Sequence, residues 1–174
     1  MVPHKIVRRT LLTLCLSMSM VAASSLLFAE QAKAALNEAD SVMSVVYTFY
    51  KNYMATDGVY SVTEYLRAQP EVDAAFVEQV ESAYKEAENS GLESLDHDPV
   101  LMAQDYPHFM QYSRPVINGA SANVIAYGIW RMGGSYPICV SLVKKTDAWR
   151  ISSVNHMDVK FGGSRDCGGM KPAP

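Results

Sequence analysis

The hydrophobic period of the chain changes once, near residue 112, and this change constrains the fold more than any other feature. Before it, apolar residues such as Val42, Val46 and Phe49 recur at three- and four-residue steps, which predicts amphipathic helices. After it, short alternating segments are separated by turn residues, which predicts antiparallel strands. We therefore expect an α+β fold in which N-terminal helices pack on a curved, cone-like antiparallel sheet.

Three helices are expected in the first half. Asn37 is placed to cap the first helix, which should end at Asp57-Gly58. The segment Ser61-Val62-Thr63-Glu64 has the capping-box pattern and should open a short second helix that stops by Pro70. The third helix should begin near Pro70 and end at Gly91, a natural left-handed stop.

The strand region predicts a meander with a hairpin at Asn118-Gly119, a dipeptide that tolerates positive φ. The expected strands are 112–117, 122–132, 136–145 and 149–157. In the second strand, Val124 and Trp130 fall on one side, and Ile125 and Tyr127 fall on the other. Both sides are apolar, so one should face the helices while the other lines a concavity or contacts another chain.

Residues 1–34 have the three parts of a secretory signal peptide. Basic residues precede the apolar run Leu11–Phe28, and Ala32-Lys33-Ala34 provides a small-residue cleavage pattern. We expect cleavage after Ala34 and a periplasmic or secreted location. The alternative is an uncleaved anchor, because the run is just long enough to span a bilayer. Its interspersed serines argue against that reading, so no stable membrane insertion is expected after cleavage.

Removal of the signal would leave 35–174 as a single cone-like domain with a glycine-rich C-terminal tail. Cys15 would leave with the signal, so Cys139 and Cys167 would be the remaining cysteines. Two cysteines in an oxidising compartment predict a disulfide. A redox or metal pair is the alternative, but neither cysteine has a neighbouring histidine in the sequence.

Charge is distributed unevenly along the chain. The formal net charge of −3 argues against a nucleic-acid-binding protein, which would need a basic face. Residues 35–111 contain three basic and fourteen acidic residues, whereas 112–174 contain eight basic and three acidic ones. The acidic half is either a solvated surface or a docking face for a basic partner protein. Its carboxylates on the outer side of the third helix should include Glu71, Glu78, Glu81 and Glu88.

The region between the helices and the strands contains a cluster of ionisable residues, namely Asp96, His97, Asp98, Asp105 and His108. Asp98, Asp105 and His108 are weak candidates for acid/base catalysis. The structural alternative is that the aspartates hold turns and the histidines are solvated. The carboxylates and imidazoles of the cluster could also hold a divalent cation. No recognised metal-ligand spacing is present, however, so neither a metal nor a cofactor is expected.

Candidate binding residues come from this loop and from the strands. They are Asp96, His97, Tyr106, Tyr127 and Trp130. Tyrosine and tryptophan combine a large apolar area with a polar group, which suits a protein interface or a ligand pocket. The structural alternative is that these aromatic residues pack in the core.

The segment 98–105, Asp-Pro-Val-Leu-Met-Ala-Gln-Asp, resembles the Asp-Pro-x-Leu-x-Ala-Gln-Asp stretch of a family of small exported bacterial domains of unknown function. The likeness covers roughly residues 42–155. It includes a Phe-Tyr pair in the first helix and a tryptophan-containing last strand, here Trp149-Arg150-Ile151. The resemblance implies a cone fold of the nuclear-transport-factor-two-like or cystatin-like kind. Members that are envelope lipoproteins carry a lipidation site, which this chain lacks.

Cone folds serve enzymes, ligand carriers and interaction modules alike, so the resemblance transfers no catalytic residue. The sequence favours an exported, non-enzymatic binding protein of the bacterial cell envelope. Its partner would be an envelope or secreted protein, such as a hydrolase that it inhibits, or a small ligand. One alternative is a cone-fold enzyme or ligand carrier that uses the 96–108 loop, with Tyr127 polarising a carbonyl. Another is a structural accessory of an envelope complex.

Overall fold

The computed structural model describes residues 5–56, 61–92, 95–157 and 166–170. The chain divides into two units, Met1–Glu38 and Ala39–Pro174, and each is described here by itself.

Helix α1, Lys5–Met54, runs through the boundary between the two units. The predicted helix start at Asn37 is therefore wrong. The residues before it, Ala29 to Leu36, are mostly Ala, Gln, Glu, Lys and Leu, which are strong helix formers. Their propensity outweighs the capping preference of one asparagine. The predicted stop at Asp57-Gly58 lies outside the described residues.

In the first unit, the described segment is helical and its side chains at positions 30–37 are exposed. The predicted cleavage pattern, Ala32-Lys33-Ala34, lies within this exposed stretch. Among the helices of the described part of the chain, none is long and apolar enough to cross a membrane.

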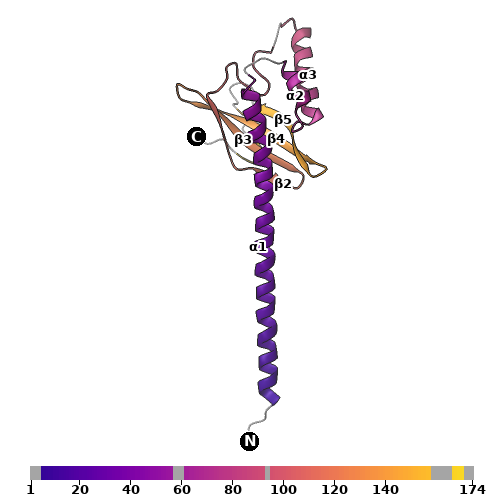
Figure 1. Cartoon of the computed structure of the whole chain (residues 1–174), viewed down its shortest axis with the longest axis vertical. Coiled ribbons are helices and arrows are strands. Elements are labelled where there is room, and N and C mark those ends of the chain that lie inside the picture. The colour runs from indigo at the N-terminus through magenta and orange to yellow at the C-terminus, as the bar shows by residue number, and fades with distance from the viewer. Residues whose placement is uncertain (1–4, 57–60, 93–94, 158–165, 171–174) are drawn as a thin grey trace. The chain divides into compact units, whose positions relative to one another are not determined.

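The second unit contains the last turns of α1 together with α2, Val62–Ala68, and α3, Ala74–Asn89 (Figure 1). Ser61 precedes α2 as expected, but its side chain makes no capping hydrogen bond and contacts the Thr63 hydroxyl at 2.9 Å instead. Helix α3 begins four residues after Pro70 because Asp73 is its cap, accepting a hydrogen bond from the Ala75 N–H at 3.0 Å.

Pro70 starts an extended segment rather than a helix. The preceding residue, Gln69, has the extended backbone that a following proline favours. The Asp73 N–H then donates to the carbonyl of Ile151 at 2.8 Å, and the Ile151 N–H donates to the carbonyl of Glu71 at 2.7 Å. This short parallel pairing covers part of the edge of the last strand.

One antiparallel sheet contains all the strands of the described residues. They are β1 Phe109–Tyr112, β2 Val116–Asn118, β3 Ser121–Ile129, β4 Ser135–Lys145 and β5 Ala148–His156. The order is β1-β3-β4-β5, and β2 also pairs with β3. The meander is confirmed, but the expected strand 112–117 is two strands. Pro115, which has no N–H to donate, lies in the break between them.

The hairpin between β2 and β3 also differs by one position from the expected turn. Asn118 pairs with Ser121, so Gly119 and Ala120 form the tip of the turn. Gly119 has a φ of 59°, the left-handed conformation that glycine adopts without steric cost.

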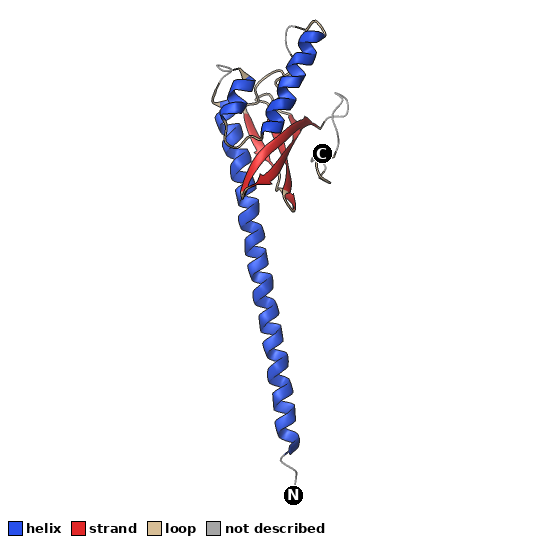
Figure 2. Ribbon diagram, turned by 90° about the vertical axis from the view of Figure 1, so that its right-hand side faces the viewer, coloured by secondary structure: helices blue, strands red, loops and turns tan. Residues whose placement is uncertain are grey.

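Side chains pack on both faces of the sheet. On the helix-facing side, Phe49 and Tyr50 of α1 join Phe76 of α3 and Val124 and Val140 of the sheet in the main core. Figure 2 shows the helices of this unit on one side of the strands. A second cluster occupies the other side. It consists of Ile125, Cys139, Met157 and Cys167, with Tyr127 and Met170 packed against it. The α+β fold class is confirmed, and one apolar face of the sheet meets the helices as expected. The other face is packed against Cys167 of the tail, and a concavity or a contact with another chain on that face stays a prediction.

Candidate functional site

The predicted disulfide joins Cys139 of β4 to Cys167, with 5.4 Å between their Cα atoms. It holds the turn 166–170 against the sheet face that lies away from the helices. The turn fits closely there, since a Cβ atom added to Gly168 would lie 2.2 Å from the side chain of Asn123. The described part of the C-terminal tail is thus a cover for the second apolar cluster.

Asp98 is surrounded by hydrogen-bond donors. Its Oδ1 accepts from the N–H groups of Val100 at 2.7 Å and Leu101 at 2.9 Å, and the Tyr53 hydroxyl donates to its Oδ2. Burial, with the nearby Asp98 carboxylate and its hydrogen bond, raises the pKa of Tyr53 well above its usual range. Tyr53 therefore stays protonated and keeps donating. This arrangement fixes the 98–103 turn to α1. The contacts of Asp98 are thus those expected of an aspartate that holds a turn, which was the structural alternative to acid/base catalysis.

The other ionisable residues of the loop lie at the surface. Asp96, His97, Asp105 and His108 are exposed. The His108 ring contacts the Phe109 ring with 5.8 Å between centroids. Within the described ranges, no three His, Cys, Asp or Glu side chains are grouped closely enough to hold a metal ion. These four residues of the loop thus present their side chains to solvent.

The predicted aromatic binding residues do not form one site. Tyr106 stacks on Tyr53, with 6.3 Å between ring centroids, and is 39% exposed. Tyr127 packs with the disulfide cluster on the other sheet face. Trp130 lies beyond the end of β3 against Tyr136, at 5.1 Å. Tyr106 is the one of these three that combines exposure with a fixed ring orientation.

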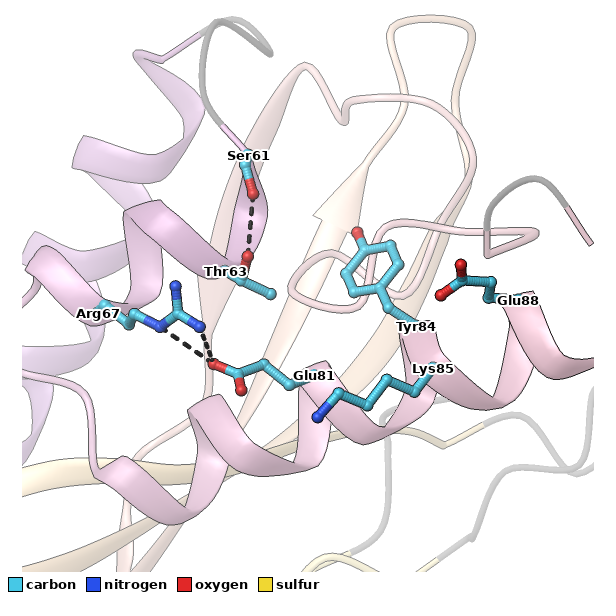
Figure 3. Close-up of a pocket in the computed structure, with 7 residues that line it drawn as sticks. All are labelled: Ser61, Thr63, Arg67, Glu81, Tyr84, Lys85 and Glu88. Atoms are coloured by element: carbon cyan, nitrogen blue, oxygen red, sulfur yellow. Dashed lines mark hydrogen bonds and ion pairs between the residues drawn. The ribbon is translucent and has the colours of Figure 1, made fainter.

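A groove between α2 and α3 was not anticipated from the sequence. Arg67 of α2 bridges to Glu81 of α3, with 2.6 Å between Nη2 and Oε1 and 3.1 Å between Nε and the same oxygen. Figure 3 shows this pair spanning the space between the two helices. The sequence predicts both helices. It does not predict that Arg67 and Glu81 are in contact, because the two residues lie fourteen positions apart on different helices.

The ion pair borders two hollows. The smaller, of about 320 Å³, is lined by Ser61 and Thr63 from the start of α2 and by Tyr84, Lys85 and Glu88 from α3 (Figure 3). These side chains offer hydroxyls and both signs of charge. Burial, followed by the charge of Asp98, raises the pKa of Tyr84, so its hydroxyl remains protonated.

The larger hollow, of about 630 Å³, lies between α2, the 69–72 segment, α3 and Arg150 of β5. Its apolar lining includes Leu66, Val72 and Val77, and Glu78 stands on its α3 side. Leu66 and Val72 belong to the main core, so this part of the lining is held by the packing of the domain.

The predicted acidic outer side of the third helix is partly confirmed. Glu78 and Glu88 are exposed on α3, and Glu81 is half-buried in its pairing with Arg67. The placement of Glu71 is wrong, because it belongs to the extended segment before α3.

Comparison with known proteins identifies a fold relative. No family model matches the chain, and a search of curated proteins finds no match. A chain from the crystal structure of the type VI native effector-immunity complex Tae3-Tai3 of Ralstonia pickettii has a similar fold. The similarity has a TM-score of 0.50 at 20% identity, covering 68% of this chain and 96% of that chain. The selenomethionine form of that complex gives 0.48 at 19% identity, covering 68% and 97%.

Proposed function

We propose that this chain is an exported, non-enzymatic binding protein of the bacterial cell envelope, of the kind that neutralises a secreted effector protein. The observation that carries the proposal is the fold shared with nearly the whole length of a chain crystallised in an effector-immunity complex. A domain of this type acts by covering part of its partner, so it needs a rigid surface rather than a catalytic set.

The interior of the domain supports binding at the surface. The space between α1 and the sheet is filled by side chains with no exposed area, such as Val46, Tyr50, Ile138 and Val140. A ligand carrier or a cone-fold enzyme would hold its ligand in that space. The hollows described above lie instead along α2 and α3, where a protein partner has access.

Export supports the same proposal. We assign residues 1–34 as a signal peptide, and the boundary between the two units follows Glu38, four residues beyond the proposed cleavage position. Cys139 and Cys167 form the disulfide that an oxidising compartment permits. The likeness of 98–105 to small exported bacterial domains is consistent with this location, and we propose membership of that family.

The test uses the secreted product of an adjacent reading frame as the partner. A host that exports this product to its periplasm, with and without the full-length protein, is followed for growth. The purified pair is then analysed by size-exclusion chromatography. We expect the protein to restore growth and to elute with the secreted product as a stoichiometric complex.

The same host exporting an unrelated toxic hydrolase is the control, and the protein should not protect it. Growth that stays impaired while both proteins are present and exported, together with separate elution, would refute the inhibitor function.

A further inference from the structure

The turn between β3 and β4 carries an exposed thioether. Met132 lies in this turn and is 97% exposed, the largest exposure among the large apolar side chains of the described residues. The next largest is that of Leu36, at 66%. The sulfur atom of Met132 is therefore open to small molecules in the surrounding solution.

The backbone of the turn is fixed by hydrogen bonds. The Gly133 N–H donates to the carbonyl of Trp130 at 3.1 Å, and the Trp130 N–H donates to the carbonyl of Gly134 at 3.2 Å. Gly133 and Gly134 have φ values of 91° and 87°, which glycine adopts without steric cost. The Trp130 ring packs against Tyr136, with 5.1 Å between centroids. An ordered turn thus presents Met132 to solvent, so the exposure of this residue is a property of the fold.

The other methionines of the second unit are shielded. Met157 is 2% exposed and belongs to the cluster around the disulfide. The remaining five are half-buried, and each packs against one of the two apolar clusters. They are Met43, Met54, Met102, Met110 and Met170. Of the seven methionines at positions 39–170, all of which the structure describes, Met132 is thus the one that is fully exposed.

A thioether reacts with a hydroperoxide to give a sulfoxide, and its susceptibility follows its exposure. A lone pair of the sulfur attacks the terminal oxygen of the hydroperoxide. The S–O bond forms as the O–O bond breaks, and the proton moves to the leaving oxygen. The sulfur loses two electrons, and the hydroperoxide is reduced to water or an alcohol. At Met132 the polar product would lie in solvent, whereas at Met157 it would lie in a buried apolar cluster.

We propose that Met132 is a site of reversible oxidation, at which a hydroperoxide forms methionine sulfoxide before any other methionine of residues 39–170 reacts. Methionine sulfoxide reductases restore the thioether, and the exposure of Met132 gives such an enzyme access to it. The inference goes beyond the proposed function and does not depend on it, because it uses only the surroundings of the methionine side chains.

The experiment treats the folded full-length protein with a small excess of hydrogen peroxide and follows oxidation by the masses of tryptic peptides. Cleavage after Arg131 and Lys144 gives a peptide whose only methionine is Met132. The peptide 151–160 contains Met157 alone in the same way. We expect the first peptide to gain an oxygen atom at least about tenfold faster than the second. In protein unfolded by urea, the two peptides should be oxidised at similar rates.

Met132→Leu should remove the fast oxidation, because leucine has a similar volume but no sulfur. Met110→Leu is the matched control and should keep it, since Met110 is half-buried. Purified methionine sulfoxide reductases, added to the folded oxidised protein, should return the peptide containing Met132 to its original mass.

Oxidation of Met157 or of a half-buried methionine as fast as that of Met132 in the folded protein would overturn the proposal. A lower melting temperature of the protein oxidised at Met132 alone would do the same, because it would place this side chain in a packed environment. A sulfoxide that the reductases leave unchanged in the folded protein would show that the oxidation is not reversible there.

Discussion

At the scale of single residues, the Asp98 carboxylate is the polar anchor of the loop before the sheet. Two backbone N–H groups and the Tyr53 hydroxyl donate to it, so three donors would be left unmatched without it. The sequence motif beginning at Asp98 identified the residue but left its role open between acid/base chemistry and turn formation. Its partner Tyr53 lies 45 positions earlier, and hydrophobic period alone cannot indicate which buried tyrosine turns its hydroxyl toward a loop.

Tyr53→Phe removes the side-chain donor to Asp98 while keeping the ring. We expect the free energy of unfolding to fall by about 1.5–3 kcal/mol, because a hydrogen bond to a charged group is lost in a buried setting. Urea unfolding measures this change in the free energy of unfolding, provided that its dependence on urea concentration is the same in both proteins. The control is Tyr47→Phe, a tyrosine that is 55% exposed on the same helix, which should change stability by less than about 0.5 kcal/mol. Equal effects of the two changes would contradict the assigned role of Tyr53.

The ion pair between Asp73 and Lys145 makes stability depend on pH. The hydrogen bond from Lys145, with that from the Ala75 N–H, holds the pKa of Asp73 below its ordinary value. A carboxyl with a lowered folded-state pKa contributes stability above its unfolded pKa of about 3.9 and loses it as the pH falls toward the folded value. The loss should be about 1 kcal/mol, since Lys145 is half exposed.

Asp73→Asn isolates this effect, because asparagine is also a good helix cap but carries no charge. Melting temperatures measured from pH 7 down to pH 2 should fall less steeply below about pH 4 in the variant than in the unmodified protein. Parallel pH profiles for the two proteins would contradict the prediction.

At the scale of elements, β3 and β4 approach closely where Gly128 faces Tyr136. A Cβ atom at position 128 would lie 2.3 Å from the Tyr136 ring, so we expect Gly128→Ala to lower the free energy of unfolding by about 1–3 kcal/mol through overpacking. In a Tyr136→Ala background the same change should cost much less. Denaturant unfolding of the four proteins in a double-mutant cycle measures the coupling. If the free-energy changes of Gly128→Ala and Tyr136→Ala simply added, an alanine at position 128 would not clash with the Tyr136 ring.

The sequence predicts well which segments are helices and which are strands, and less well where each of them begins and ends. The helix and strand periods identified α3, β3, β4 and β5, because each buries a regular stripe or row of side chains, and the capping-box pattern identified α2. The errors occur where two local preferences compete. The sequence predicts a helix start near Pro70, but Asp73 caps α3, and the residues between them pair with β5. A hydrogen bond to a strand 80 residues away leaves no mark in a local pattern.

At the scale of the whole molecule, the disulfide and the turn that it holds stabilise the domain. Linking residues 28 positions apart stabilises by about 3.6 kcal/mol on the chain-entropy estimate. Cys139→Ser/Cys167→Ser should therefore lower the melting temperature by several degrees or more. It should also raise binding of a hydrophobic dye as Ile125 and Met157 become uncovered. Calorimetry with and without a reductant provides the comparison. A melting temperature that does not change would contradict a stabilising role for the bridge.

The candidate groove shows the limit of sequence reasoning at this scale. Composition indicated an acidic helical half, and that asymmetry is present in α3. The groove depends on how α2 and α3 pack on core residues from distant parts of the chain, and Arg67 and Glu81 pair across it. Such a surface is a property of the assembled domain, whereas the disulfide could be predicted from the count of cysteines.

Cys167 is buried within the described part of the C-terminal tail, and its bond to Cys139 bears on the order of events in the proposed export. Thiols stay reduced in the cytosol, so a newly made chain there would leave its final turn unfastened and the apolar patch around Ile125 and Met157 without a locked cover. Under the proposed export, the chain would cross the membrane with its final turn not yet linked to the sheet. Oxidation after the proposed export would then link Cys167 to Cys139 and complete the cover of this apolar patch.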